Sequence, residues 1–394
     1  MSSSEWLPTE VLIPFLPNDV ALNLLARVPR QYHPILSAVS KPIRSAVSSP
    51  HFFSLRSLLN VTETVPYLRV RAFRGIHERP YDNWFAVHRN PNPTNNNLLK
   101  FAPVPRIPRD SEIRFSACAV VGPKIYVIGG RVIRTIEDPQ GRRYGPSSDV
   151  WILDCRSHTW ERGPSMRSPR ALASAAVVDG KIYVVGGTQT ALWAEVLDPT
   201  VGRWEDIPGP LDGTDPELFN FQLVDGKISI CLNSDESNLI EFRLNTTTKT
   251  WEVVGNEFSP TSDICVVDGV SYSSFGRNVG KIERFDEKIG EWKELKGVEE
   301  GKPEYVFGHR QTLINLDGRL VVLFAEMRLE ETIDPKMGKA GLWCAEIDVT
   351  ENGDGDWWGR VNWSDKVVLL PEVTWDTPGG YEFFYYKEGL SVSL

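Results

Sequence analysis

The side chains that most often carry catalysis or bind metals are scattered along this sequence of 394 residues. The six histidines form no His-x-x-x-His or His-Glu-x-x-His pair, the spacings that bring two imidazoles to one helix face; they are His33, His51, His77, His88, His158 and His309. No glycine-rich phosphate-binding loop precedes a predicted helix, because Gly129-Gly130 ends a predicted strand and opens a loop. We therefore expect no catalytic residue, no bound metal and no cofactor.

Cysteine usage indicates a reducing environment. The five cysteines are an odd number and contain no Cys-x-x-Cys pair; they are Cys118, Cys155, Cys231, Cys265 and Cys344. Three of them lie in strand-like segments, where a free thiol packs as a small core residue. We expect reduced, buried cysteines rather than disulfides.

The charge balance narrows the classes of partner. A net charge of −9 argues against a general nucleic-acid binder and against binding to an anionic membrane. No apolar run approaches the ~18 residues that a membrane span requires, and the first five residues carry no basic signal-peptide region. These observations predict an intracellular protein, in the cytoplasm, the nucleus or both.

Most of the sequence is predicted to form short strands, and these strands occur in a repeated unit. Two strand-like segments flank Asp179-Gly180, a dipeptide that favours a tight hairpin because its residues tolerate positive φ. A double glycine, Gly186-Gly187, follows, and two further strands lead to Trp204. The unit recurs, and its tryptophans lie 41 to 47 residues apart; they are Trp160, Trp204, Trp251 and Trp292.

These repeats resemble the kelch repeat, which implies a mainly β fold, a β-propeller. We predict six blades within residues 61–394, at about 66–105, 115–165, 170–210, 218–256, 263–298 and 309–363. The first blade shows only three strands, so a strand within 372–394 must close the ring; the candidates are residues 382–386 and 373–375. One tryptophan per blade favours packing between blades over stacking on a ligand.

Residues 13–60 have a helical pattern instead, after a segment, 1–12, that we expect to be flexible. A first helix should run to Val28, with Asn18 or Asp19 capping its first turn, and a second should span residues 32–40. A third begins at Pro42, and a fourth short one follows Pro50. Fewer than fifty residues cannot bury all of these apolar side chains internally, so a partner surface is predicted.

Leu16-Pro17-Asn18-Asp19-Val20 and the helices after it resemble an F-box, and F-box plus kelch resembles the plant family of F-box/kelch-repeat proteins. The resemblance implies docking on a Skp-type adaptor, and through it on a cullin-RING ligase. By position, the adaptor-facing residues are Leu16, Pro17, Val20, Leu24, Leu25, Val28, Pro29, Ile35 and Val39. The alternative is that these helices merely cap the propeller.

The function implied is that of a non-catalytic substrate receptor, whose propeller binds an unidentified target protein for ubiquitination. Two alternatives remain: a kelch-propeller enzyme acting on a small molecule, and a scaffold that binds proteins without their degradation. Iron-dependent specifier proteins with this fold would have a Glu-x-x-x-Asp-x-x-x-His run, which the residues before His309 do not match. Nor is there a clustered set of copper ligands with a Tyr–Cys pair, as an oxidase would need.

Arginines gather in the loops where a propeller would bind its target. In kelch propellers, loops between the second and third strands share a face with the connections between blades. Arginine favours interfaces because its planar fork pairs carboxylates and stacks on aromatic rings. The predicted target-binding residues are Arg106, Arg109, Arg131, Arg134, Arg142, Arg143, Arg167 and Arg170, facing an acidic or phosphorylated segment.

Overall fold

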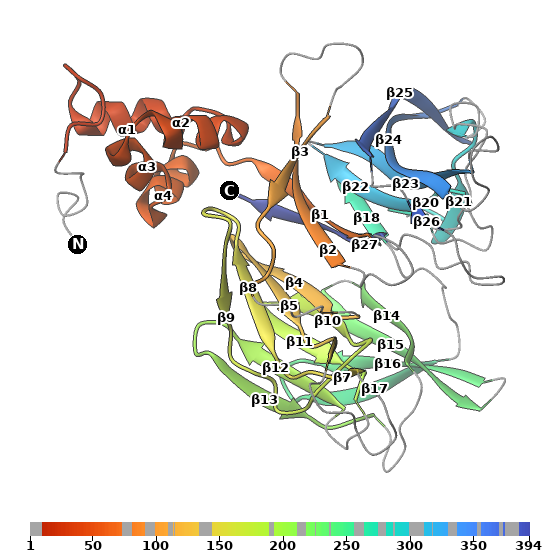
Figure 1. Ribbon diagram of the computed structural model, residues 1–394. Helices are drawn as coiled ribbons and strands as arrows, with labels where there is room; N and C mark the ends of the chain where they lie inside the picture. Colours follow the sequence, from red (N-terminus) through yellow and green to blue (C-terminus); the bar gives the residue numbers. More distant parts are fainter. Residues whose placement is uncertain are drawn as a thin grey trace.

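The computed structural model consists of a small group of helices at the N-terminus and a ring of antiparallel sheets (Figure 1). It describes residues 10–72, 81–90, 99–108, 113, 115–133, 144–188, 193–210, 218–224, 226–235, 238–255, 264–274, 281–286, 288–298, 311–316, 318–329, 337–352, 356–369, 373–374 and 386–394. Within these ranges, no helix is both long and apolar enough to cross a membrane.

The helical domain contains four short α-helices and one turn of 3-10 helix among its described residues. These are α1 (Asn18–Ala26), η1 (Arg30–Tyr32), α2 (His33–Val39), α3 (Lys41–Val47) and α4 (Pro50–Leu58). Ser40 Oγ accepts a hydrogen bond from the Ile43 amide at 3.2 Å, and Ser49 Oγ accepts one from the Phe52 amide at 3.2 Å. These serines, each with a proline in the following turn, explain where α3 and α4 begin.

The start of α1 differs from the prediction. Pro17 occupies the N-cap position, and no described side chain caps the first turn. Asn18 instead accepts from the Leu12 amide at 3.0 Å and donates to the Glu10 carbonyl at 3.0 Å. The predicted Asn18 or Asp19 cap is therefore wrong. Leu12 is 4% exposed and packs in the core, although we expected it to lie in a flexible segment.

The predicted architecture, a six-bladed propeller preceded by a small helical domain, is confirmed. Blade 1 combines β27 (Tyr386–Ser393), β1 (Thr64–Ala72), β2 (Tyr81–Arg89) and β3 (Leu99–Val104). Blade 2 contains β4 (Ala117–Val121), β5 (Lys124–Ile128), β8 (Val150–Asp154) and β9 (Thr159–Arg162), with the small hairpin of β6 (Arg131–Ile133) and β7 (Tyr144–Pro146) inserted. Blade 3 contains β10 (Ser174–Val178), β11 (Lys181–Val185), β12 (Ala194–Asp198) and β13 (Arg203–Ile207).

The remaining blades follow the same meander. Blade 4 contains β14 (Leu218–Val224), β15 (Lys227–Asp235), β16 (Asn238–Asn245) and β17 (Thr250–Gly255). Blade 5 contains β18 (Ile264–Val267), β19 (Val270–Ser273), β20 (Glu283–Asp286) and β21 (Glu291–Glu294). Blade 6 contains β22 (Gln311–Leu316), β23 (Arg319–Leu329), β24 (Met337–Glu351) and β25 (Trp357–Leu369), and β26 (Val373–Thr374) pairs with β24.

The last strand of the chain closes the ring. β27 pairs antiparallel with β1, from Thr64 opposite Ser393 to Val70 opposite Tyr386. Beyond it, Glu63 and Leu394 exchange two backbone hydrogen bonds of 2.8 Å. This strand lies within residues 372–394, where we expected the closing strand. Of the two candidates, residues 373–374 pair with β24 instead, and of residues 382–386 only Tyr386, the first residue of β27, is described.

Two local features explain why the repeat folds as it does. Asp179 and Gly180 both have positive φ, at 49° and 73°, which a tight hairpin between β10 and β11 requires. Gly187 has φ of 69°, and a Cβ on it would lie 2.5 Å from the Ala171 carbonyl oxygen. The double glycine thus lets the connection into one blade pass close to its second strand.

Three of the four repeated tryptophans join neighbouring blades, as predicted. The indole N–H groups of Trp160, Trp204 and Trp251 donate to the carbonyls of Pro105, Pro164 and Pro208 at 2.7, 2.8 and 2.8 Å. Each of these prolines follows the outer strand of the preceding blade. The ring is therefore held by one indole hydrogen bond at each of three successive blade junctions.

The helical domain shares a hydrophobic core with the propeller. One cluster of buried residues includes Leu22 and Phe52 from the helices, Tyr67 from blade 1 and Leu153 from blade 2. Figure 1 draws the helices beside these blades and the C-terminus. The helices and the first two blades consequently form one packed unit.

Candidate protein-interaction surfaces

The strand topology gives the ring two faces. Because strands alternate in direction, the first and third turns of each blade lie on one face, here called the hairpin face. The loops between second and third strands and the connections between blades lie on the other, the loop face. Arg30 donates to the carbonyls of Cys155 and Arg156 at 2.8 and 2.6 Å, in the turn between β8 and β9. The helical domain therefore docks on the hairpin face, and the loop face is opposite.

The helical domain leaves two pairs of apolar side chains exposed. Val20 and Leu24, one turn apart on α1, are 42% and 50% exposed. Ile35 and Val39, one turn apart on α2, are 61% and 64% exposed. Residues four apart share a helix face, so each pair forms a short apolar stripe. These four residues belong to the set predicted to face an adaptor, and they are free to do so.

The other predicted adaptor-facing residues differ in exposure. Pro17 and Pro29 are exposed, whereas Leu16 and Val28 are half-buried. Leu25 is only 5% exposed and packs in the shared core, so the prediction that it contacts a partner is wrong. Adjacent helix positions point about 100° apart, which places Leu24 outside and Leu25 inside. The sequence reasoning missed Phe15, which is fully exposed in the loop before α1 with φ of 67°.

A buried polar network fixes the helical domain to the propeller. The side chain of Arg30 bonds to the β8–β9 turn, and its backbone amide donates a hydrogen bond to Glu63 Oε1 at 2.9 Å. Arg56, 1% exposed, donates to the same carboxylate oxygen at 2.6 Å and to the Val28 carbonyl at 2.8 Å. Its charge is thereby paired, as a buried arginine requires. The network sets the orientation of the helices on the ring.

His33 belongs to this network in its neutral form. Arg30 Nη1 lies 3.1 Å from Nδ1, and the Val28 carbonyl lies 3.1 Å from Nε2. Since a guanidinium only donates and a carbonyl only accepts, Nε2 carries the proton and Nδ1 accepts. Burial first, and then the positive charge of Arg30, lower the pKa of His33 to about 3. Burial also lowers the pKa of His88 and of His158, each to about 4.

Arg170 is not a surface residue of the loop face. It is fully buried with Glu195, and their side chains join at 3.0 and 3.2 Å. Arg170 Nη1 also donates to the carbonyls of Gly186 and Trp193 at 2.7 and 2.9 Å. Desolvation lowers the pKa of Arg170, and the nearby Glu195 opposes this. The prediction that Arg170 contacts a target is wrong, because it holds the blade 2–blade 3 connection onto blade 3.

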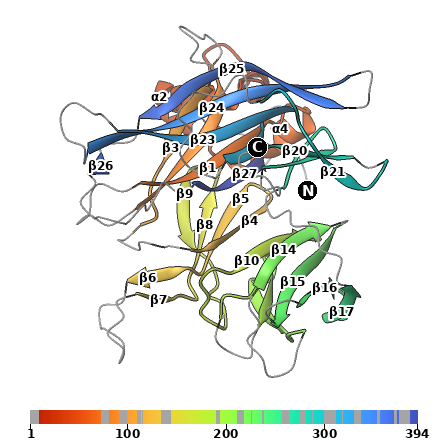
Figure 2. The same cartoon turned by 90° about the vertical axis from the view of Figure 1, so that its right-hand side faces the viewer.

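Three other predicted target-binding arginines are exposed. Arg106 lies between blades 1 and 2, and Arg131 begins the β6–β7 hairpin that projects from blade 2 (Figure 2). Arg167 lies beside Arg170 in the connection into blade 3 and pairs with Asp206 at 2.8 Å. These three occupy loop-face segments, as predicted. The remaining four, Arg109, Arg134, Arg142 and Arg143, lie outside the described residues.

Two further loop-face residues were not predicted. Leu172 is 59% exposed with φ of 62°, and Phe115 has φ of 56°. Arg131 lies over the Phe115 ring, with its Cζ 5.9 Å from the centroid. No clear sequence signal marked them, since the same connections also carry Ile107, Ile113 and Met166.

The comparisons with known proteins agree with this division. The family of the FKB95, Kelch-repeats domain matches residues 84–368, and the F-box domain matches residues 13–55. The chain belongs to the F-box/kelch-repeat family. It is 36% identical over 382 residues to an F-box/kelch-repeat protein of Arabidopsis thaliana, covering 90% of this chain and 86% of that one. A second F-box/kelch-repeat protein of the same plant is 32% identical over 383 residues, covering 90% and 89%.

One solved structure has a weak similarity to this chain. It is titled "Structure of YjhT" and has a TM-score of 0.43 at 12% identity, covering 75% of this chain and 98% of that one.

An F-box joined to a kelch propeller fits the substrate-adaptor role in Skp–cullin–F-box ligases.

The described residues of this F-box/kelch-repeat protein assemble no metal centre. No group of three or more His, Cys, Asp or Glu side chains in the described ranges could hold a metal ion. None of the five cysteines forms a disulfide, and four are buried. Burial raises the pKa of Cys155 and of Cys265 to about 12, so both thiols stay protonated and unreactive at neutral pH.

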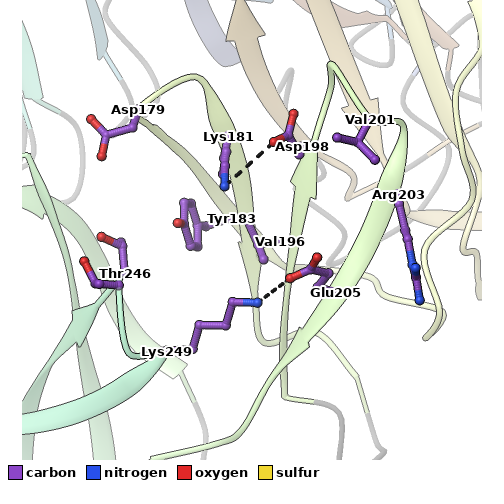
Figure 3. Close-up of a pocket in the computed structure, with 11 residues that line it drawn as sticks. Asp179, Lys181, Tyr183, Val196, Asp198, Val201, Arg203, Glu205, Thr246 and Lys249 are labelled. Atoms are coloured by element: carbon purple, nitrogen blue, oxygen red, sulfur yellow. Dashed lines mark hydrogen bonds and ion pairs between the residues drawn. The ribbon is translucent and has the colours of Figure 1, made fainter.

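A polar pocket of about 380 Å³ lies on the hairpin face between blades 3 and 4 (Figure 3). The turns of blade 3 and the β16–β17 turn of blade 4 form its walls. Lys181 pairs with Asp198 at 3.7 Å, and Lys249 pairs with Glu205. Both lysines of the pocket wall are thus offset by a neighbouring carboxylate.

Proposed function

We propose that this F-box/kelch-repeat protein is the substrate-recognition subunit of a Skp–cullin–F-box ubiquitin ligase. The F-box binds a Skp-type adaptor and through it a cullin-RING ligase, while the propeller binds a target protein. The chain performs no covalent chemistry itself. It raises the local concentration of the target near the ubiquitin-conjugating enzyme, in the cytoplasm, the nucleus or both.

The observation that carries the adaptor half is the pair of apolar stripes on α1 and α2. Other apolar side chains of the F-box, such as Leu22 and Phe52, pack into the core shared with the propeller. Val20, Leu24, Ile35 and Val39 do not, although the F-box is already anchored. Covering the exposed part of each would contribute roughly 1 kcal/mol at about 25 cal/mol per Å². Four such residues therefore supply roughly 4 kcal/mol toward adaptor binding.

The junction between the domains supports the second half of the proposal. Arg30 fixes the F-box on the hairpin face through short hydrogen bonds to the Cys155 and Arg156 carbonyls. A target held on the loop face would then sit at a set distance and orientation from the adaptor. Fixed geometry favours transfer, because orienting two reactants removes part of the entropic barrier to their reaction.

A charge-substitution experiment tests the adaptor surface. The double variant Val20→Asp/Leu24→Asp places carboxylates in the α1 stripe, and we expect it to weaken binding of a Skp-type adaptor at least about 100-fold. Both positions are exposed, so the melting temperature should stay near that of the parent chain. The assay is titration of purified adaptor into the full-length chain.

Leu58→Asp is the matched control, because Leu58 is 81% exposed on α4, outside the two stripes. It should bind the adaptor as the parent does. Parental affinity in the double variant would contradict the assignment of α1. In a ligase reconstituted with the parent chain, the captured target should also receive ubiquitin. A target that is captured but receives no ubiquitin would favour a non-degradative scaffold.

A further inference from the structure

Two large apolar residues on the loop face have a backbone conformation that side chains disfavour. Phe115 and Leu172 each stand two residues before the first strand of their blade, β4 and β10. Their φ angles are 56° and 62°, and neither residue lies in a hairpin turn. Left-handed backbone is strained for residues with a Cβ, and such strain gathers at functional sites.

The fold requires this backbone conformation but not these side chains. The Leu172 amide donates to the Phe115 carbonyl at 2.8 Å, so the two connections are joined by a backbone hydrogen bond. Glycine would make the same bond without the strain. Yet Leu172 is a leucine with 59% of its surface exposed, outside the core clusters of blades 2 and 3. Its side chain costs stability and contributes no packing that the described core uses.

A cation stands beside this pair. Arg131 is exposed, and its guanidinium lies over the Phe115 ring at 5.9 Å. Among the described residues, no acidic side chain forms an ion pair with Arg131, whereas the nearby Arg167 is paired with Asp206 at 2.8 Å. The Phe115 ring thus carries a cation on one side and is joined through its backbone to an exposed leucine.

We propose that Phe115, Leu172 and Arg131 form the contact site for a target peptide with a carboxylate next to a bulky apolar side chain. This rests on the proposed receptor function and specifies its target chemistry. The apolar side chain packs against Leu172 and the half-buried Phe115, and the carboxylate takes a bidentate pair with Arg131. Among the described residues, Arg131 is the one cation on this pair without an acidic ion-pair partner, and a single positive charge matches one carboxylate better than a phosphate dianion.

The test is peptide selection on the full-length chain. A phage-displayed library of short random peptides is selected for binding to the parent chain. Synthetic copies of the selected peptides are then titrated against the variants. Leu172→Gly removes the docking side chain while relieving the backbone strain, so it should weaken peptide binding at least about tenfold without lowering the melting temperature. Arg131→Ala should weaken binding about tenfold at low salt and less at high salt. Val201→Gly, at a 70% exposed position on the hairpin face of blade 3, is the control and should leave peptide binding unchanged.

Each outcome decides for or against the contact site. Selected peptides that share an acidic residue beside a bulky apolar one, and that lose affinity for Leu172→Gly, support it. Failure to select any peptide, full binding to Leu172→Gly, or a lower melting temperature in that variant would overturn it. A preference for phosphoserine in place of the acidic residue would also overturn it. All three variants should bind the adaptor with the affinity of the parent chain. If the contact site is refuted, the proposed receptor function is therefore still tested separately by adaptor binding.

Discussion

Replacing Arg170 by methionine should destabilise the chain strongly, although this arginine lies in a connection between blades. Its guanidinium is fully buried and joins Glu195, which also accepts from the amides of Arg167 and Ser168 at 2.8 and 3.1 Å. Removing one partner of a buried ion pair costs about 3–5 kcal/mol, because the other charge is left without compensation. The whole blade 2–blade 3 connection depends on that carboxylate.

The cost converts into a measurable shift in melting temperature. At about 2.1 cal/mol/K per residue, unfolding of the 394-residue chain as one unit has an entropy of roughly 0.8 kcal/mol/K. A loss of about 4 kcal/mol then lowers the melting temperature by about 5 °C. Arg167→Met, in the same connection but 54% exposed, removes only a surface pair and should cost less than about 1 kcal/mol.

A second substitution tests the mechanism. Glu195→Gln removes the negative charge but keeps an acceptor oxygen for only one of the two backbone amides, because they donate to different carboxylate oxygens. In the parent it should destabilise, whereas in the Arg170→Met background it should recover roughly 1–2 kcal/mol. Thermal and urea unfolding of the four proteins gives the coupling. The reasoning is refuted if Arg170→Met melts within about 1 °C of the parent, or if Glu195→Gln costs the same in both backgrounds.

Two other perturbations have defined outcomes. Deleting residues 386–394 removes β27 with Val392 and Leu394, which are 0% and 3% exposed, so stability should fall by roughly 3–6 kcal/mol; a truncated chain with the parental melting temperature would mean that the ring does not depend on this strand. Stability should also fall with acidity, because His33 has its pKa lowered to about 3 in the folded chain and near 6.5 when unfolded. Its contribution is complete above about pH 6.5 and is lost below it, by up to about 1.4 kcal/mol per pH unit, as the unfolded state takes up the proton. His33→Gln should flatten this slope in urea titrations, and an unchanged slope would place the titration elsewhere.

The propeller could be predicted because its repeat is marked by signals that lie close together in the sequence. Asp179-Gly180, the double glycine and the tryptophan of each outer strand are all read within one repeat, and their packing follows from the same short segment. The closing strand could not be located in this way. β27 pairs with a strand near the other end of the propeller, so nothing local sets its register, and its polar sequence is a weaker strand pattern than the aromatic run before it.

The interaction residues were predicted less well than the fold, for similar reasons. Arg170 resembles a loop residue until Glu195, 25 positions later, is brought beside it. Leu25 differs from Leu24 only by its rotation about the helix, and the apolar pattern of α1 supports burial of either. The strain at Phe115 and Leu172 depends on the path between blades, which no single repeat specifies.

The central claim is that the F-box of this chain binds a Skp-type adaptor, and calorimetric titration of purified adaptor into the full-length protein tests it most directly. The account predicts saturable binding at one adaptor per chain, lost in Val20→Asp/Leu24→Asp and kept in Leu58→Asp. A parent chain that is folded by its melting transition and yet releases no binding heat, with no complex on gel filtration, would contradict it.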